Sequence, residues 1–131
     1  MGSTILYIED NSDNMMLVKR ALEARGYNFL QAINGIEGIR VAENEEVDLI
    51  LLDINLPDID GYEVARRIRS SNKKHAVLTY VPIIAITANA LKGDAEKALA
   101  AGCDVYMSKP INIRELWARV EAIVPSPQTD E

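Results

Sequence analysis

Short apolar segments alternate with amphipathic helical patterns along this chain of 131 residues, and the alternation is repeated five times. The predicted strands are residues 4–8, 27–33, 47–52, 81–86 and 104–107. The run at 47–52 is apolar at nearly every position, which is typical of a strand buried on both faces of a parallel sheet. Repeated βα alternation predicts one parallel sheet with helices on both of its faces.

Each predicted strand is followed by a helical pattern with its own start or stop signals. Capping residues open these helices at 11–14, Asn34, Asp60 and Asn112, and glycines 26 and 102 end two of them. The predicted apolar stripes consist of Met16, Val18, Ala21 and Leu22; Ile36, Ile39, Val41 and Ala42; Tyr62, Val64, Ala65 and Ile68; Ala95, Ala98, Leu99 and Ala101; and Leu116, Val120 and Ile123. Residues 70–80 are predicted to form a surface connection, and 125–131 a polar tail after one domain at 1–124.

Composition limits which partners and which cellular compartment are expected for this protein. The formal net charge of -6 argues against nucleic acid or an anionic membrane as a direct ligand, and favours a cation or a basic protein surface. The single cysteine, Cys103, excludes an internal disulfide and is expected to be a small core residue. With no apolar run of transmembrane length and no signal peptide, we expect a cytoplasmic protein.

Charged and hydroxyl side chains follow four of the five predicted strands. Glu9 and Asp10 follow the first, Asp53 the third, Thr87 the fourth and Lys109 the fifth. In a doubly wound sheet these strand ends can be neighbours at the carboxyl edge, where such folds place their binding crevice. Three carboxylates and one ammonium give the predicted pocket a formal charge of about minus two.

Such a cluster of like charges must take up a proton or a cation. Oxygen ligands with room for water suit Mg²⁺, which binds through one or two carboxylates and a phosphate. An aspartate can also be a nucleophile that forms an aspartyl phosphate, with a metal, a lysine and a hydroxyl stabilising the phosphoryl oxygens. Each residue alone has a simpler role, as a helix-end charge, a strand-end hydroxyl or a solvated cation, but their joint placement at one edge favours the site.

Five segments carry a resemblance to the receiver domain of two-component response regulators. They are Ile8-Glu9-Asp10-Asn11, Leu52-Asp53-Ile54-Asn55-Leu56-Pro57, Asp60-Gly61, Ile86-Thr87-Ala88 and Ser108-Lys109-Pro110. Around 91–94 and 101–103 the chain is most similar to single-domain cell-cycle regulators and to the receivers of hybrid histidine kinases. The resemblance implies a flavodoxin-like, doubly wound α/β fold with a five-stranded parallel sheet of order 2-1-3-4-5 and five helices.

The resemblance also implies a role for each site residue. Asp53 would accept a phosphoryl group from a phosphohistidine, while Glu9, Asp10, Asp53 and the Asn55 backbone carbonyl would bind Mg²⁺. Thr87 and Lys109 would contact the attached phosphoryl group. The aromatic Tyr106 would turn inward as Thr87 moves, and the Lys109-Pro110 bond is expected to be cis.

Two classes of function remain open on the sequence. The first is a phosphorylation-driven signalling switch, which is not an enzyme beyond its own phosphorylation and dephosphorylation. Its partners would be a sensor histidine kinase or histidine phosphotransfer protein and a downstream protein, without nucleic acid or membrane. The alternative is a degenerate receiver that binds partners without phosphorylation. In receivers of winged-helix transcription factors, which belong to the family that the chain resembles, an aspartate often stands at the position of Val105. Its absence weakens the case for their dimer, so we expect a monomer or a weak phosphorylation-dependent dimer.

Overall fold

The computed structural model describes residues 2–71, 80–88 and 93–126. The strands are β1 (Thr4–Ile8), β2 (Asn28–Ala32), β3 (Leu49–Asp53), β4 (Ile83–Thr87) and β5 (Val105–Ser108). The helices are α1 (Ser12–Glu23), α2 (Gly35–Asn44), α3 (Gly61–Ser71), α4 (Asp94–Ala101) and α5 (Ile113–Ile123). All four strand pairings are parallel and the order is β2-β1-β3-β4-β5, so the predicted fold class and strand order are confirmed.

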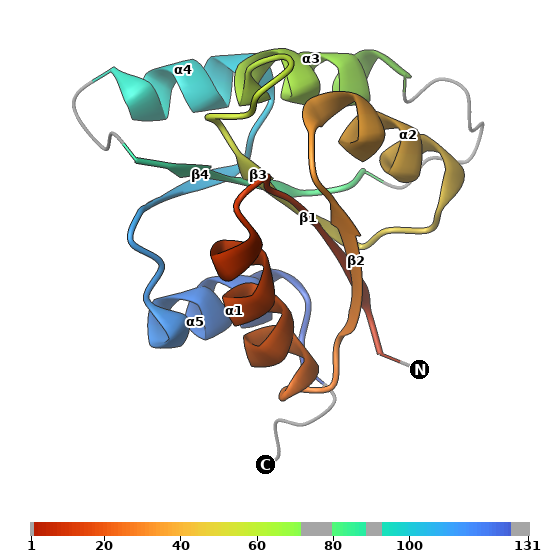
Figure 1. Ribbon diagram of the computed structural model, residues 1–131, viewed down its shortest axis with the longest axis vertical. Coiled ribbons are helices and arrows are strands. Elements are labelled where there is room, and N and C mark those ends of the chain that lie inside the picture. The colour runs from red at the N-terminus through yellow and green to blue at the C-terminus, as the bar shows by residue number, and fades with distance from the viewer. Residues whose placement is uncertain (1, 72–79, 89–92, 127–131) are drawn as a thin grey trace.

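The sheet separates two helical layers (Figure 1). Helices α1 and α5 cover one face, and α2, α3 and α4 cover the other. Strands β3 and β4 lie inside the sheet and are buried at every position, as their apolar runs require. A hydrophobic core lies on each face of the sheet, and alternate residues of β1 belong to different cores. Ile5 and Tyr7 pack with α1 and α5, whereas Leu6 and Ile8 pack on the opposite face.

Two interior strands begin two residues later than predicted. Asp48 stands just before β3, where its backbone N–H donates to the Thr4 carbonyl and its carboxylate accepts from the Thr4 N–H. Pro82 has no N–H to donate, and β4 begins at the next residue. At the other end of β3, Asp53 pairs with Ile86 of β4, so it is the last residue of the strand rather than the first residue after it.

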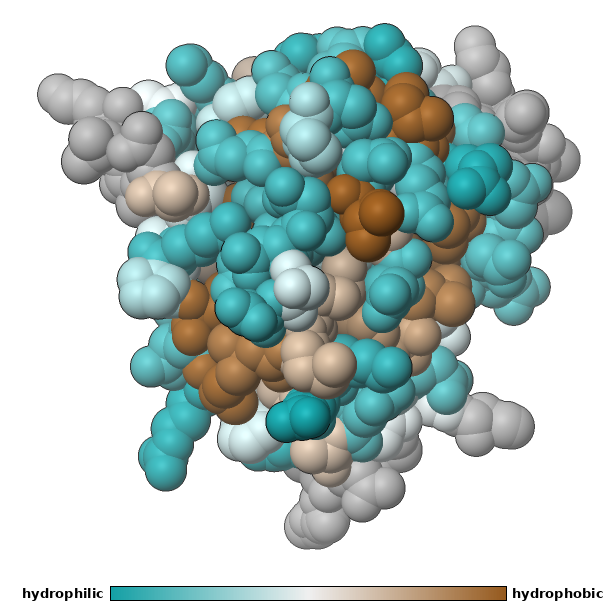
Figure 2. All heavy atoms as spheres, in the orientation of Figure 1, coloured by the Kyte–Doolittle hydropathy of each residue, from teal (hydrophilic) through white to brown (hydrophobic). Residues whose placement is uncertain are grey.

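Three predicted stripe residues are exposed instead of buried. Met16 is 48% exposed, and its neighbour Met15 takes the core position, because the spacing 15, 18, 22 follows one helix face. Ile36 and Leu99 are also exposed. In α2 the buried positions near its start are glycines. A Cβ at Gly38 would lie 2.5 Å from Ile8 of β1, and one at Gly35 would lie 2.8 Å from Val64 of α3, so neither position has room for a larger side chain. Hydrophilic side chains cover most of the face in Figure 2, with hydrophobic ones in separate patches.

The predicted connection at 70–80 begins later than expected. Helix α3 continues through Ser71, so the first two positions of that segment are helical. Residues 72–79, which include His75, lie outside the described part of the chain, as do Leu91 and Lys92 of the family-like segment. Cys103 is buried in the core beneath α3 and α4, as expected. None of the helices in the described ranges is long and apolar enough to cross a membrane.

The C-terminal segment begins by packing against α1. Ser126 is buried, and its hydroxyl donates a hydrogen bond to the carbonyl of Arg25. The Tyr27 hydroxyl donates to the Val124 carbonyl, and the Arg25 guanidinium stacks on Trp117 of α5 at 4.0 Å from the ring centre. These contacts hold the end of α5 against the end of α1, on the side of the sheet away from α3.

Gly61 places the start of α3 directly against the end of β3. Its N–H donates to the Ile54 carbonyl at 2.8 Å. A Cβ at this position would lie 2.6 Å from the Ile54 Cα and 2.7 Å from the Asp53 carbonyl oxygen, both of them backbone atoms that cannot turn away. Glycine is therefore required for the close approach that keeps the loop after Asp53 compact.

Candidate functional site

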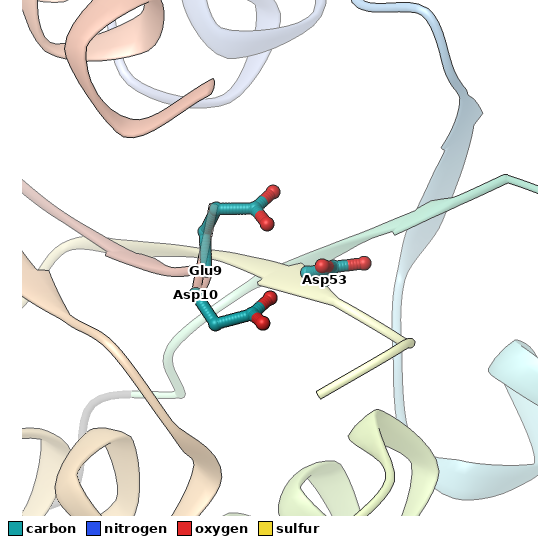
Figure 3. A group of neighbouring side chains, drawn as sticks. All are labelled: Glu9, Asp10 and Asp53. Carbon is teal, nitrogen blue, oxygen red and sulfur yellow. The ribbon is translucent and has the colours of Figure 1, made fainter. Parts of the chain in front are cut away.

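Three carboxylates meet at the carboxyl edge of the sheet. Glu9 and Asp10 follow β1, and Asp53 ends the adjacent strand β3, whose Leu52 pairs with Ile8. One oxygen from each of the three acids lies within 4.8 Å of the others. Figure 3 shows Glu9 and Asp10 leaving the strand end on opposite sides, with both carboxylates directed toward the side of Asp53. Glu9 and Asp53 are 1% exposed, whereas Asp10 is exposed to solvent.

Lys109 brings a cation to the two buried carboxylates. Its Nζ lies 3.2 Å from Asp53 Oδ1 and 3.6 Å from Glu9 Oε1. The lysine follows β5, two strands away from Asp53, and its backbone N–H donates to the Thr87 carbonyl at 2.8 Å. The Lys109-Pro110 peptide is cis, as expected. Lys109 therefore reaches across the end of β4 to the acidic cluster.

The remaining predicted residues, Thr87, Asn55 and Tyr106, lie on neighbouring elements. Thr87 ends β4, beside β3, and is buried. The Asn55 backbone N–H donates to Asp53 Oδ1 at 3.1 Å, while its side chain is exposed. Tyr106 lies further back along β5, paired with Ala85, and packs half-buried against the core of α3 and α4. The structure thus gathers Glu9, Asp10, Asp53 and Lys109 in direct proximity, with Thr87 on the adjoining strand end and Tyr106 behind it.

The two buried carboxylates differ in proton affinity. Burial is the main cause that raises the pKa of Asp53 to about 6, and the nearby Glu9 carboxylate adds to it against the opposing effects of the Asn55 N–H and Lys109. Burial also acts to raise the pKa of Glu9. There it is outweighed by hydrogen bonds from Tyr7, Asp53 and the Asn11 N–H and by the charge of Lys109, so the pKa of Glu9 is lowered. Asp53 is therefore the group that is costly to ionise without a cation.

The two shortest hydrogen bonds to Glu9 were not predicted from the sequence. The hydroxyl of the fully buried Tyr7 donates to Glu9 Oε1 at 2.7 Å, and the Asn11 N–H donates to Glu9 Oε2 at 3.1 Å. The contact of Tyr7 could have been predicted, because residues two apart on a strand project from the same face of the sheet. A tyrosine two positions before a strand-end acid is thus placed to reach that acid.

The donor set fits a hard divalent cation. The converging ligand atoms are carboxylate oxygens, two from buried residues and one from an exposed residue, which would leave part of a cation's surface to water. Mg²⁺ prefers such oxygen ligands and keeps several waters, so the cluster Glu9, Asp10 and Asp53 matches its requirements. When bound, a divalent cation would neutralise the carboxylates and the oxygens of a phosphoryl group.

The burial of Asp53 predicts a stability effect that depends on pH. Its folded pKa of about 6 lies above the ordinary 3.8, so the folded state retains a proton that the unfolded state has lost between these pH values. The contribution of this ionisation to the free energy of unfolding therefore falls as pH rises through that window. We expect Asp53→Asn to stabilise the metal-free protein by about 2–3 kcal/mol above pH ~7, and the difference to vanish below pH ~4.

Urea unfolding in EDTA at several pH values measures this difference. An excess of Mg²⁺ should reduce the difference by stabilising the wild type, because a cation held by the three carboxylates would bind only the folded state. A variant that is less stable than wild type across the whole pH range would contradict the assignment of a costly buried charge to Asp53.

Comparison with known proteins agrees with this geometry. The sequence matches the response regulator receiver domain family over residues 5–121. The polar-differentiation response regulator DivK of Brucella anthropi is 39% identical over 113 residues, which cover 86% of this chain and 89% of that protein.

Solved structures of receiver domains are also similar to this chain. The receiver domain of a sensor histidine kinase from Pseudomonas aeruginosa, solved with a magnesium ion in its active site cleft, is 39% identical, with a TM-score of 0.82 and coverage of 96% of this chain and 100% of that one. The receiver domain of Ssk1 from Saccharomyces cerevisiae, crystallised with the histidine phosphotransfer protein Ypd1, is 29% identical, with a TM-score of 0.88 and coverage of 94% and 89%. With this fold, this acidic cluster and a family match over most of its length, the chain belongs to the response regulator receiver domains of two-component signal transduction.

Proposed function

We propose that this receiver is switched by phosphorylation of Asp53, with Mg²⁺ held by Glu9, Asp10, Asp53 and the backbone carbonyl of Asn55. The observation that carries the proposal is the pairing of a buried Asp53 with Lys109 at 3.2 Å, inside a cluster of three carboxylates. A buried aspartate at the sheet edge with a cation beside it combines a nucleophile with a group that stabilises phosphoryl oxygens.

The proposed reaction moves one phosphoryl group from a histidine to Asp53. A carboxylate oxygen of Asp53 attacks phosphorus, the new O–P bond forms and the P–N bond to the donor histidine breaks, with its electron pair returning to the imidazole nitrogen. Lys109 stabilises the negative charge on the phosphoryl oxygens. Hydrolysis of the aspartyl phosphate by water later restores the carboxylate and releases inorganic phosphate.

Attachment of the phosphoryl group is the signal. It replaces the single negative charge of Asp53 with nearly two, so the site gains about one negative charge. Thr87 and Lys109 are the neighbouring groups that can donate hydrogen bonds to it. We propose that Thr87 moves toward the phosphoryl group and that Tyr106, which lies behind it on β5, moves inward, which changes the surface that a downstream protein contacts.

The partners are proposed to be proteins. A phosphohistidine donor is needed by the chemistry, and a sensor histidine kinase or a histidine phosphotransfer protein supplies one. The receiver of Ssk1 crystallised with Ypd1 gives a precedent for such a pairing in a protein of the same fold. The alternative of a receiver that acts without phosphorylation is disfavoured because the acceptor, the acids and the lysine are all in place.

Transfer from a phosphorylated histidine phosphotransfer protein tests the proposal. The donor is loaded with radiolabelled phosphate, mixed with this chain in Mg²⁺ or in EDTA, and both proteins are followed by gel autoradiography. We expect label to leave the donor and appear on this chain only in Mg²⁺. A folded chain that accepts no label from a histidine donor or from acetyl phosphate would support the phosphorylation-independent alternative instead.

A further inference from the structure

We propose that the hydroxyl of Tyr7 is a positioning group for the metal site. It holds the Glu9 carboxylate in place for Mg²⁺, so that Lys109 pairs with Asp53 rather than with Glu9. The inference rests on the proposed function, and it assigns a role to a side chain of the α1–α5 core that lies beneath the site. Its measurable consequence is the affinity of the site for the cation.

Tyr7 reaches Glu9 from within the core. Its side chain is fully buried in the cluster formed by α1, α5 and the sheet, and its hydroxyl donates to Glu9 Oε1 at 2.7 Å. A phenol hydroxyl is protonated near neutral pH, so it acts as the donor in this hydrogen bond. Because the ring is enclosed by core side chains, it holds the hydroxyl in one position beside the carboxylate.

The other contacts of Glu9 Oε1 are longer. The Asn14 side-chain amide lies at 3.5 Å and Lys109 Nζ at 3.6 Å. Lys109 is closer to Asp53 Oδ1, at 3.2 Å. Without the Tyr7 hydroxyl, the short contact to this oxygen is lost and Lys109 is the nearest strong donor left to replace it. Glu9 would then turn toward the lysine, away from its place among the three acids.

The expected consequence is a weaker metal site. Groups that hydrogen-bond a metal-binding side chain fix its orientation, and their removal costs about 10–100-fold in metal affinity or activity. Because Tyr7 acts on Glu9 through one hydrogen bond, we expect Tyr7→Phe to raise the dissociation constant for Mg²⁺ about tenfold. The half-saturating Mg²⁺ concentration for labelling by acetyl phosphate should rise by the same factor.

Tyr27→Phe is the matched control. Tyr27 belongs to the same core cluster, is 3% exposed and donates its hydroxyl to the backbone carbonyl of Val124, away from the acidic cluster. Each variant removes one buried hydroxyl and leaves the ring. Both are expected to lower stability in EDTA by a similar amount, but only Tyr7→Phe should change the affinity for Mg²⁺.

Calorimetric titration of the full chain with MgCl₂ measures the affinity, and labelling rates at a series of Mg²⁺ concentrations give the half-saturating value independently. In the background of Glu9→Gln, Tyr7→Phe should cause no further loss, because the hydroxyl acts through the Glu9 carboxylate. Equal affinities of wild type and Tyr7→Phe within about twofold, or equal losses in Tyr7→Phe and Tyr27→Phe, would overturn the inference. A wild-type chain that binds no Mg²⁺ would instead refute the metal site of the proposed function.

Discussion

Replacing Asp53 with asparagine is expected to abolish phosphorylation of this chain. The amide has nearly the shape of the carboxylate and fits the same buried position, but it carries no charge and is a poor nucleophile toward phosphorus. Neither a phosphorylated histidine phosphotransfer protein nor acetyl phosphate should then label the chain. Intact-mass spectrometry after incubation with the donor and Mg²⁺ measures the result directly.

Asp58→Asn is the control for this substitution. Asp58 lies in the loop that follows β3, where its carboxylate accepts hydrogen bonds from the Gly35 and Ile36 N–H groups at the start of α2. An asparagine keeps one of the two acceptor oxygens, so this variant loses one of these hydrogen bonds but should remain folded and be labelled at the wild-type rate. If Asp53→Asn were labelled as fast as the control, another residue would have to be the acceptor.

The second large effect is expected for Lys109→Ala. Lys109 is the cation beside Asp53, and removal of a group that stabilises the charge on reacting oxygens costs about 10²–10³-fold in rate. Mg²⁺ should still bind, because the substitution removes no oxygen ligand and takes a positive charge away from the cation's site. We therefore expect labelling to slow by about this factor while calorimetry still detects Mg²⁺.

A lysine on the outer side of α4 supplies the comparison. Lys97 is exposed, away from the acidic cluster, and Lys97→Ala should leave both the rate of labelling and the affinity for Mg²⁺ unchanged. The outcome that speaks against the role of Lys109 is labelling of Lys109→Ala within about threefold of wild type at saturating Mg²⁺. Loss of Mg²⁺ binding in this variant would also count against it.

Much of this arrangement could be predicted from sequence because parallel strands bring their ends to one edge. The apolar run before Asp53 indicated an interior strand, and in a doubly wound sheet the strand ends that carry Glu9, Asp10 and Lys109 can lie beside it. The resemblance to receiver domains implied the strand order. No side-chain detail was needed for that step, since the strand order alone determines which ends are neighbours. The structure agrees with it, in the order β2-β1-β3-β4-β5.

Details that depend on packing were harder to predict. Met15 and Met16 are chemically identical, and only the exact rotation of α1 on the sheet buries the first and exposes the second. The hydrogen bonds from the start of α2 to Asp58 join residues more than twenty positions apart, and no local pattern encodes them. Tyr7 is an intermediate case, because the period of the strand places it on the same side as Glu9 but an apolar role for its ring would look identical on the sequence.

The most direct test of the central claim is intact-mass spectrometry of the wild-type chain after incubation with acetyl phosphate, once with Mg²⁺ and once with EDTA. The account predicts an adduct of one phosphoryl group that forms only with Mg²⁺, is stable in acid and is lost in base, as an aspartyl phosphate should be. An adduct that forms equally well in EDTA, or one that survives base, would contradict the proposal that Asp53 is phosphorylated in a Mg²⁺-dependent site.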